Sequence, residues 1–441
     1  MASEMKNSGI EWIGEIPKDW NLTKLKYIVQ SPLQYGANES GIDYRDELPR
    51  YIRITDITMD NKLKEEGKLS LEKDKAKPYL LHNNDILFAR SGASVGKTFI
   101  YRIQYGKAAF AGYLIRATIN SNKAVPDFIY YNTLGHNYEA WKQRIFIQST
   151  IQNIGADKFS NYIFPNPTLS KQQAIVEFLD GKCAEIDKIL AKTCASIEEY
   201  RKLKQAVITQ AVTQGVRGDR EMKDSGIEWI GKVPGEWDLV PFRHVLKERQ
   251  EKNSPVKSTE RLSLSIDLGV TLYSEKTTNL DRFKEDFEQY KLAHKGDLVM
   301  NSMNMIVGAS GVSNYYGCVS PVYYTYYDEI EDHVTAKYCE YIFRSKAMLR
   351  VLYSLGKGIY AIVRGDDRVN TCRLKVSKED LKSIILPIPS ILEQREIVNY
   401  LNVKCTEIDN LIVKKERYLA EIENYKKSLI YEYVTGKKEV P

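Results

Sequence analysis

Two stretches of this chain, MKNSGIEWIGEIPKDWNL from Met5 to Leu22 and MKDSGIEWIGKVPGEWDL from Met222 to Leu239, are two copies of one motif, called the opening motif below. They are identical at 12 of 18 positions at an offset of 217 residues. A second pair, Pro165–Thr213 and Pro387–Thr435, repeats at an offset of 222. The two middles between these repeats hardly resemble each other. A duplicated frame around two different inserts predicts two tandem halves with related functions and separate specificities.

Composition and length place the chain among globular proteins. Its 441 residues, 43% of them hydrophobic, suffice for two to four domains with their own cores. No run approaches 18 apolar residues and the N-terminus, MASEMKNSG, lacks the apolar core of a signal peptide, so we expect a cytoplasmic protein with no membrane segment. The six cysteines and five histidines show no metal-ligand spacing. A net charge of +6 permits nucleic-acid binding through local patches without requiring it.

Each half ends in a segment with the pattern of one long helix. After Lys171 the chain has no proline until beyond Gly215, and apolar residues recur every 3.6 residues on average. The predicted stripe of the first copy consists of residues 175, 179, 183, 186, 190, 194, 197, 200, 203, 207 and 211, and that of the second runs from 397 to 433 and includes 425. Ser170 and Ser390 are the predicted N-caps. Cys183 and Cys405 hold equivalent stripe positions and are interpreted as small buried residues.

A helix of this length, about 65 Å at 1.5 Å per residue, is too long for one small domain to cover its apolar stripe. We therefore expect the two copies to pack on each other as an antiparallel, coiled-coil-like pair, with the two domains at opposite ends and related by a pseudo-two-fold axis. The alternative is that each helix packs only on its own domain.

These patterns predict an α+β fold with an internal repeat. Two mixed α/β domains, at 1–168 and 218–389, alternate with two spacer helices, at 169–217 and 390–441. Within the first middle, Tyr51–Ile57 alternates like a strand. Asp85 and Asp297 mark equivalent points, because each precedes a short apolar strand that leads into a loop rich in small residues.

Several stretches resemble enzyme motifs only superficially. Gly92–Thr98 is one residue short of the phosphate-binding loop GxxxxGK[ST], and Ser91 stands where that motif needs glycine. Pro165–Thr168 lacks the second proline and the aromatic residue of the Asn-Pro-Pro-aromatic loop of amino-methyltransferases. The sequence therefore predicts no active site, no bound cofactor and no metal in this chain.

The doubled opening motif, the doubled helix with its P-x-P…Q…IV…L…EID pattern and the two divergent middles resemble the specificity subunit of type I restriction-modification systems. The resemblance covers essentially all 441 residues. It implies that the middles are target recognition domains, each reading one half of a bipartite site in double-stranded DNA, and that the helices fix the gap between the half-sites. It also implies a non-catalytic chain that binds two methyltransferase subunits and two restriction subunits. S-adenosylmethionine, ATP and Mg²⁺ would then act only in those partners, which methylate adenine N6 and translocate and cut DNA.

Physical reasoning agrees with this resemblance. Two recognition domains on one rod combine two weak half-site contacts through a high effective concentration, and a rigid rod makes the half-site spacing a geometric constant. Since the middles differ, the site should be asymmetric. Two alternatives remain open: an architectural coiled-coil protein with two DNA-binding domains, and the recognition part of a self-sufficient modification enzyme.

Candidate contact residues follow from side-chain chemistry. Arg, Lys, Asn, Gln and Ser side chains on loops read base edges in the major groove. The resulting candidates are Arg53, Arg90, Ser91, Lys97, Gln148 and Ser149 in the first middle, and Asn301, Asn304, Ser310, Lys357, Tyr360 and Arg364 in the second. For each, a solvated loop residue or a phosphate contact is the alternative interpretation.

The tryptophans of the opening motifs also have two interpretations. They are either surfaces for the methyltransferase subunit or core residues that tie each domain to the helices; they are Trp12, Trp20, Trp229 and Trp237.

Overall fold

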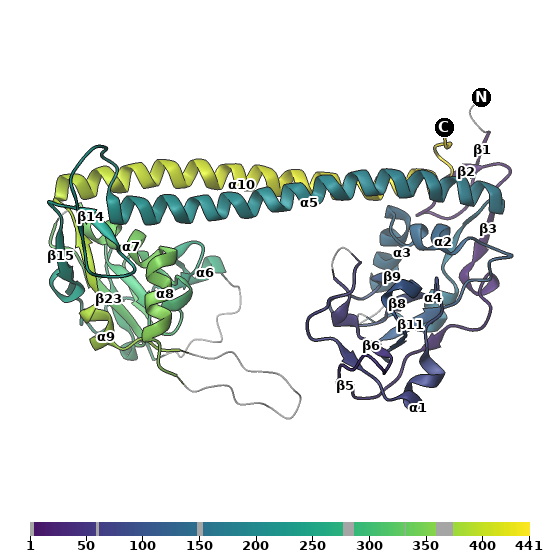
Figure 1. Ribbon diagram of the computed structural model, residues 1–441, viewed down its shortest axis with the longest axis horizontal. Coiled ribbons are helices and arrows are strands. Elements are labelled where there is room, and N and C mark those ends of the chain that lie inside the picture. The colour runs from purple at the N-terminus through teal and green to yellow at the C-terminus, as the bar shows by residue number, and fades with distance from the viewer. Residues whose placement is uncertain (1–3, 59–60, 148–152, 277–285, 331, 359–373) are drawn as a thin grey trace. The chain divides into compact units, whose positions relative to one another are not determined.

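The computed structural model, shown as a ribbon in Figure 1, describes residues 4–58, 61–147, 153–276, 286–330, 332–358 and 374–441. The chain divides into two compact units: unit 1 combines Met1–Cys194 with Arg417–Pro441, and unit 2 is Ala195–Glu416. Each unit holds one opening motif, one middle, the first part of the long helix after that middle and the last part of the other long helix. The predicted mixture of helices and sheets with two long helices is confirmed.

The repeated motifs build the same frame in both units. Each opening motif forms an antiparallel hairpin and then a strand that pairs with the strand preceding the long helix. In unit 1 these elements are β1 (Met5–Asn7), β2 (Glu15–Pro17), β3 (Asn21–Lys24) and β12 (Ile163–Asn166). In unit 2 they are β13 (Met222–Asp224), β14 (Lys232–Pro234), β15 (Asp238–Pro241) and β24 (Ile385–Ile388). The frame therefore brings the two ends of each middle together beside the start of its helix.

The middles share one antiparallel four-stranded sheet. In unit 1 its order is β4-β11-β8-β9, formed by Gln34–Tyr35, Leu114–Ala117, Ile86–Ala89 and Thr98–Ile100. In unit 2 the order is β16-β23-β20-β21, formed by Lys247–Glu248, Tyr323–Tyr327, Leu298–Asn301 and Ser310–Val312. In both sheets the last of the four strands in the chain lies between the first and the second: β11 lies between β4 and β8, and β23 lies between β16 and β20. The two middles therefore share a sheet topology that their sequences do not reveal.

The remaining strands differ between the units. Unit 1 has a second sheet in the order β10-β6-β7-β5, formed by Ala108–Phe110, Arg50–Ile52, Leu69–Ser70 and Ile42–Asp43, with β10 and β6 parallel. Unit 2 has two separate antiparallel pairs, β17 (Leu262–Ser265) with β18 (Gly269–Leu272) and β19 (Lys291–Ala293) with β22 (Gly317–Val319). The divergence of the middles is thus concentrated outside the shared sheet.

Short helices cover the middles. Those of unit 1 are α1 (Lys73–Ala76), α2 (Pro126–Asn132), α3 (His136–Ile147) and α4 (Ala156–Ser160). Those of unit 2 are α6 (Tyr273–Lys276), α7 (Val334–Arg344), α8 (Lys346–Leu355) and α9 (Lys378–Ser383). The main core of unit 1 includes Phe88, Phe128 and Phe159, and that of unit 2 includes Phe242, Tyr326 and Phe343.

The predicted strand over Tyr51–Ile57 is wrong beyond its first residues. The strand β6 ends at Ile52, and a 3₁₀ turn covers Ile54–Asp56. The Asp56 carboxylate accepts a hydrogen bond from the backbone N–H of Arg53 at 2.7 Å, which turns the chain out of the sheet. In a capping box, the side chain of the third residue of a helical turn accepts a hydrogen bond from the backbone N–H of the N-cap residue, as Asp56 does here. This local hydrogen bond outweighs the strand preference that the alternating apolar residues indicate.

The long helices are α5 (Leu169–Gln214) and α10 (Ile391–Val434). The predicted N-cap Ser390 is confirmed, since its Oγ accepts a hydrogen bond from the Glu393 amide at 3.4 Å. Ser170 lies inside α5, and Thr168 holds the equivalent place with its Oγ1 3.4 Å from the Lys171 amide. The predicted N-cap Ser170 is therefore wrong: α5 begins at Leu169, and at the offset of 222 Ser390 corresponds to Thr168.

Within each unit the two long helices run antiparallel, as predicted. Ion pairs join them, and the partner's number falls along α10 as the number rises along α5. The pairs are Asp187 with Lys426 at 2.6 Å in unit 1, and Lys204 with Asp409 at 2.7 Å and Arg201 with Glu416 at 2.9 Å in unit 2. Charged groups at several levels therefore fix the register of the helix pair.

The apolar stripe is only partly as predicted. Ile175, Leu179, Cys183 and Ile186 are buried, and so is Cys405. In contrast, three predicted stripe residues are exposed, namely Cys194, Leu203 and Tyr425. The half-buried aliphatic stems of Lys204 and Lys426 stand next to two of these positions and carry the interhelical ion pairs. Next to Leu203 and Tyr425, charge pairing between the helices thus replaces the predicted apolar contact.

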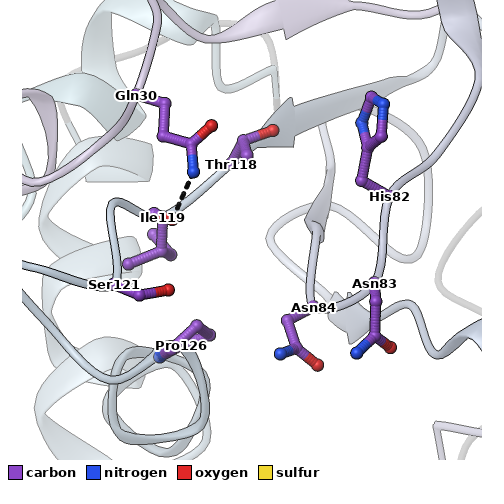
Figure 2. A pocket seen from close by; sticks show the side chains of 8 residues that line it. All are labelled: Gln30, His82, Asn83, Asn84, Thr118, Ile119, Ser121 and Pro126. Atoms are coloured by element: carbon purple, nitrogen blue, oxygen red, sulfur yellow. Dashed lines mark hydrogen bonds between the residues drawn. The ribbon is translucent and has the colours of Figure 1, made fainter.

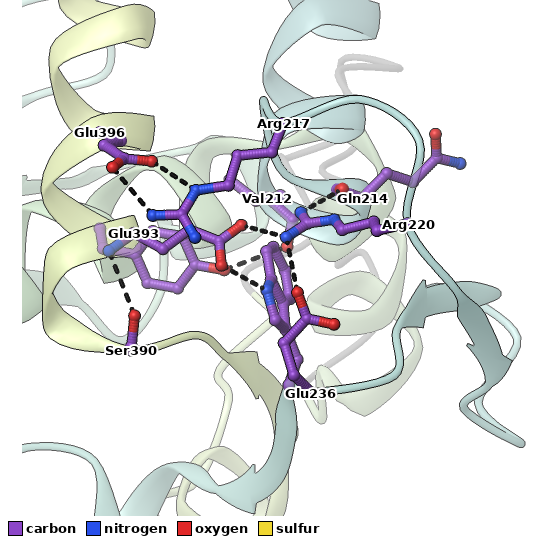
Figure 3. Close-up of polar contacts among 10 residues, drawn as sticks. Val212, Gln214, Arg217, Arg220, Glu236, Ser390, Glu393 and Glu396 are labelled. Carbon is purple, nitrogen blue, oxygen red and sulfur yellow. Dashed lines mark hydrogen bonds and ion pairs between the residues drawn. The ribbon is translucent and has the colours of Figure 1, made fainter.

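In unit 2 a polar network fastens the end of α5 to the start of α10 (Figure 3). Arg217 makes a bidentate pair with Glu396, at 2.7 and 2.8 Å. Arg220 bridges Glu393 at 2.6 Å and Glu236 at 3.0 Å. It also donates to the carbonyl oxygen of Gln214 at 2.7 Å, which satisfies one of the free carbonyls at the helix end.

Candidate nucleic-acid interface

Both middles contain the same turn at the start of a central strand. The Asp85 carboxylate accepts from the His82 amide at 2.8 Å, and the Asp297 carboxylate accepts from the His294 amide at 2.8 Å. The residue before each aspartate has a positive φ, 70° at Asn84 and 90° at Gly296. The predicted equivalence of Asp85 and Asp297 is therefore confirmed in geometric detail.

One arginine balances each of these buried carboxylates, and it comes from a different strand in each unit. Arg249, which follows β16, makes a bidentate pair with Asp297 at 2.6 and 3.0 Å. Arg116 on β11 lies 3.7 Å from Asp85, which also accepts from Thr118 Oγ1 at 2.5 Å. A buried carboxylate that is paired and hydrogen-bonded in this way is a structural group. The two aspartates stabilise the sheets that carry the candidate surfaces.

Two predicted DNA contacts of unit 1 are engaged within the fold. Arg53 binds Asp56 through Nε at 3.1 Å and Nη2 at 2.8 Å, and it donates to the Gly67 carbonyl. Lys97 donates from Nζ to the carbonyl oxygens of Ile57, at 3.3 Å, and Thr58. These cations hold the loop after β6, and a DNA contact by either of them stays a prediction. In the stretch Gly92–Thr98, which resembles a phosphate-binding loop, the Lys97 ammonium group thus binds backbone carbonyls of its own chain.

Arg90 and Ser91 lie on a different part of unit 1, which carries exposed tyrosines. The Arg90 guanidinium stacks 4.8 Å from the ring centroid of Tyr35. Its backbone N–H donates to the carbonyl of Tyr113, whose side chain is 64% exposed. Ser91 forms a β-bridge with Asn153. We call Tyr35, Arg90, Ser91 and Tyr113 the arginine-tyrosine cluster.

This cluster has the chemistry of a nucleic-acid contact. Aromatic rings and guanidinium planes stack on bases, and arginine reads guanine edges. Tyr35 and Tyr113 are not among the residues predicted from the sequence. The 30 tyrosines of the chain hint at contact surfaces, but their number does not show which of them are exposed. Gln148 and Ser149 lie outside the described residues.

In unit 2 the predicted contacts divide by burial. Ser310 is 1% exposed, and Asn301 is 9% exposed with its Oδ1 accepting from the Met303 amide at 3.0 Å. These two residues face the interior, which corrects their assignment. Asn304 and Lys357 are exposed, and Lys357 pairs with Asp380 at 3.0 Å. Tyr360 and Arg364 lie outside the described residues.

A polar pocket of about 300 Å³ lies beside the His82–Asp85 turn (Figure 2). Its walls consist mainly of amide, hydroxyl and imidazole groups, contributed by Gln30, His82, Asn83, Asn84, Thr118, Ile119, Ser121 and Pro126. Among these lining residues His82 alone has an ionisable side chain, so the pocket offers hydrogen bonds rather than an acid–base pair. In unit 2 the residue equivalent to Asn84 is Gly296, and the ring of His333 packs so closely on it that a Cβ there would lie 2.3 Å from the ring.

In each opening motif the first tryptophan is half-buried and the second is buried. Trp20 is 5% exposed and Trp237 is 0% exposed, and Trp237 Nε1 donates to Glu393 at 3.0 Å. These two belong to the core, which excludes them as surfaces for a partner. Trp12 and Trp229 are half-buried, and for them the partner contact stays a prediction.

Two general features concern the described part of the chain. Within the described ranges, no group of three or more His, Cys, Asp or Glu side chains is arranged to hold a metal ion. Among the helices that the structure describes, none combines the length and the apolar character needed to span a membrane.

Comparison with known proteins agrees with the duplicated frame. Residues 17–199 match the family described as Type I restriction modification DNA specificity domain. A Methanocaldococcus jannaschii protein named as the type I restriction enzyme MjaX specificity subunit is 26% identical, covering 97% of this chain and 96% of that protein. The MjaVIII specificity subunit of the same organism is 22% identical, over 82% of this chain and 81% of its own.

A solved structure shares the fold. It comes from a study of complex assembly and conformational transition of the type I R-M system, and it superposes with a TM-score of 0.65 at 13% identity. The superposition covers 96% of this chain and 99% of the other, and at this identity it shows the fold alone. With the doubled frame, these findings show that the chain is similar to the specificity subunits of type I restriction-modification systems.

Proposed function

We propose that this chain is the sequence-specific DNA-binding subunit of a type I restriction-modification complex. Each middle reads one half of an asymmetric, bipartite site in double-stranded DNA, and the chain directs adenine-N6 methylation and cleavage by its partner subunits. The observation that carries this proposal is a repeated sheet and turn with different exposed side chains in its two copies. Unit 1 presents the arginine-tyrosine cluster, whereas unit 2 presents Asn304 and Lys357. Such a design suits two recognition surfaces with separate specificities.

The paired helices support the proposal that the gap in the DNA site is fixed. Ion pairs between α5 and α10 occur in both units and set one register. A helix pair with a fixed register acts as a semi-rigid spacer, which would link two weak half-site contacts into one specific contact. Removing four residues, about one turn, from both helices should therefore shorten the gap of the recognised motif.

The catalytic work is proposed to lie in the partners, two methyltransferase subunits and two restriction subunits, in the cytoplasm. S-adenosylmethionine, ATP and Mg²⁺ would bind there. On α10 of unit 2, exposed apolar side chains repeat along one helical face and supply a surface for the methyltransferase subunit; they are Leu392, Tyr400, Val403 and Leu411. Their exposed fractions range from 39% at Tyr400 to 64% at Leu392.

The experiment that tests the function is co-expression of the chain with its methyltransferase subunit, followed by genome-wide mapping of methylated adenines. We expect a two-part, asymmetric motif with a fixed gap that disappears when this chain is omitted. Exchanging one middle for that of a relative should replace one half-site only. A stable complex without a motif, or methyl transfer by this chain alone with S-adenosylmethionine, would contradict the proposal.

A further inference from the structure

Two lysines of α9 share one carboxylate of the four-stranded sheet in unit 2. Lys382 donates to Glu248 Oε2 at 2.7 Å, and Lys378 donates to its Oε1. Glu248 is 9% exposed, whereas the two lysine side chains are about one third exposed. Each ammonium group carries three N–H donors, so one carboxylate cannot satisfy both.

A third lysine increases the positive charge at this place. Lys291 on β19 is half-buried, and its Nζ donates to the Tyr323 carbonyl at 2.9 Å. Burial, followed by the charge of Lys378, lowers the pKa of Lys291 below its usual value. The ammonium groups of Lys291 and Lys378 therefore repel each other, and a bound anion would relieve that repulsion.

Two more lysines adjoin α9. Lys357 and Lys375 form a β-bridge with both backbone hydrogen bonds at 2.9 Å, and the Lys357 side chain pairs with Asp380 of α9. We call Lys291, Lys357, Lys375, Lys378 and Lys382 the lysine cluster. Three carboxylates accompany it, those of Glu248, Glu379 and Asp380, so the cluster keeps an excess of two positive charges.

We propose that the lysine cluster is a phosphate-binding surface by which unit 2 holds the backbone of double-stranded DNA beside its half-site. The inference rests on the proposed function and separates, within unit 2, the side chains that bind the DNA backbone from those that read bases. Lysine is a point charge that binds phosphate without reading sequence, so the cluster contributes affinity and orientation rather than specificity. Glu248 holds Lys378 and Lys382 in place and at the same time limits their attraction for phosphate.

Unit 1 has different chemistry at the corresponding positions. At the offset of 222, Ala156 and Ser160 of α4 correspond to Lys378 and Lys382. The arginine-tyrosine cluster lies near this helix instead, because Tyr35 accepts a hydrogen bond from the Ala156 amide at 3.0 Å. The two half-sites therefore depend differently on salt: backbone charge contributes more to the binding of unit 2, and stacking contributes more to that of unit 1.

The test measures DNA binding by the assembled complex with the methyltransferase subunit as a function of salt concentration. The variant is Lys378→Gln with Lys382→Gln, and the probes are duplexes with the mapped motif and with both half-sites scrambled. We expect the affinity for both duplexes to fall by a similar factor, about tenfold at low salt, and the salt slope to decrease by about two. Glu248→Gln should act in the opposite direction and tighten binding to the scrambled duplex.

Two controls separate charge from folding. Lys378→Arg with Lys382→Arg keeps both charges and should keep the affinity and the salt slope. Lys337→Gln with Lys346→Gln removes two exposed lysines from α7 and α8, which contribute nothing to the cluster, and should leave both quantities unchanged.

The outcomes distinguish this inference from the function on which it rests. If the unmodified complex methylates a bipartite motif but the double glutamine variant binds with unchanged affinity and slope, the phosphate-binding surface is refuted and the proposed function stands. A loss confined to the motif duplex would refute it as well, since it would make the lysines base readers. If the variant impairs only assembly with the methyltransferase subunit, the cluster is a protein interface. An unmodified complex with no sequence preference would contradict the proposed function itself.

Discussion

Lys171 and Glu393 hold equivalent positions in the first turns of the two long helices and carry opposite charges. Lys171 pairs directly with Asp19 of the first opening motif at 2.6 Å. Glu393 stands beside Glu236, the counterpart of Asp19, and Arg220 bridges the two carboxylates. The joint between helix and opening motif is thus built twice with different charges. Docking the start of α10 on the first opening motif would bring Glu393 next to Asp19, so the charges favour the observed pairing of each helix start with the opening motif of its own half.

Burial makes the two joints unequal in energy. Replacing Lys171 by Ala should lower the stability of unit 1 by about 0.5 kcal/mol, because its pair with Asp19 is exposed to solvent. Replacing Glu393 by Ala should cost unit 2 about 3 kcal/mol, because it leaves the buried Trp237 Nε1 and the Arg220 side chain, which is 12% exposed, without this acceptor. Urea unfolding of both variants, with hydrogen exchange to assign the loss to a unit, measures the difference. Equal costs would contradict this account.

The buried aspartates should be essential for the two sheets separately. Asp297→Ala would leave the half-buried Arg249 without its bidentate acceptor. We expect the free energy of unfolding of unit 2 to fall by about 3 kcal/mol. Asp85→Ala should have a smaller effect, since Arg116 lies 3.7 Å away and keeps its hydrogen bond to the Leu80 carbonyl. Hydrogen exchange should show faster opening of β20 in the first variant and of β8 in the second. Opening of the other unit's sheet would argue against independent units.

Glu248 makes the stability of unit 2 depend on acid. Burial alone raises its pKa, but the hydrogen bonds from Lys378 and Lys382 outweigh burial and hold the pKa below its usual value of 4.5. A carboxyl with a depressed folded pKa stabilises the fold above its unfolded pKa, and this contribution disappears as the pH falls through the folded pKa. Unfolding midpoints measured from neutral pH down to about pH 3 should therefore decline less steeply in Glu248→Gln than in the unmodified chain.

The exposed face of α10 should bind the methyltransferase subunit. Leu392→Glu with Val403→Glu places two charges on this face, and we expect the methyltransferase subunit to stop co-purifying while the chain remains folded. Gln210→Glu, at an exposed position on α5 in unit 2, is the matched control. Undiminished co-purification of the double variant would locate the partner elsewhere, with half-buried Trp12 and Trp229 as the next candidates.

The arginine-tyrosine cluster should determine the half-site of unit 1. Replacing Arg90 by Ala should weaken binding by about 1–3 kcal/mol and relax one base position of that half-site. Tyr113→Ala should weaken binding by a similar amount through lost stacking and leave the half-site of unit 2 intact. Methylation mapping of each variant reads out the motif directly. Arg53→Ala is the comparison, because its side chain binds Asp56 and should affect stability more than specificity.

Periodicity and repetition were sufficient to predict much of this fold. The offset between repeats, the 3.6-residue spacing and Ser390 placed two long helices and their antiparallel pairing, because these features depend on local geometry and on the burial of one face. Asp85 and Asp297 were recognisable as equivalent because a turn is encoded by neighbouring residues. The family resemblance rested on the same repeats.

The candidate contacts were predicted less well, because burial and pairing depend on residues far apart in the chain. Nothing near Ser310 in the sequence signals that its side chain is buried. The sequence around Lys97 does not reveal that its ammonium group binds the carbonyls of Ile57 and Thr58, 40 and 39 residues earlier. Glu248 lies 130 residues before Lys378, so the lysine cluster is created only when β16 and α9 pack together.

The sequence by itself therefore determined the duplicated frame, the helices and the positions of the two variable middles, all of which follow from local periodicity and from repetition. Only the tertiary structure decided which cationic side chains are fully paired within a unit and which remain exposed to a partner. Charges interact through space, with strengths that depend on distance and on burial. Those two quantities are defined once strands and helices distant in the chain have packed together.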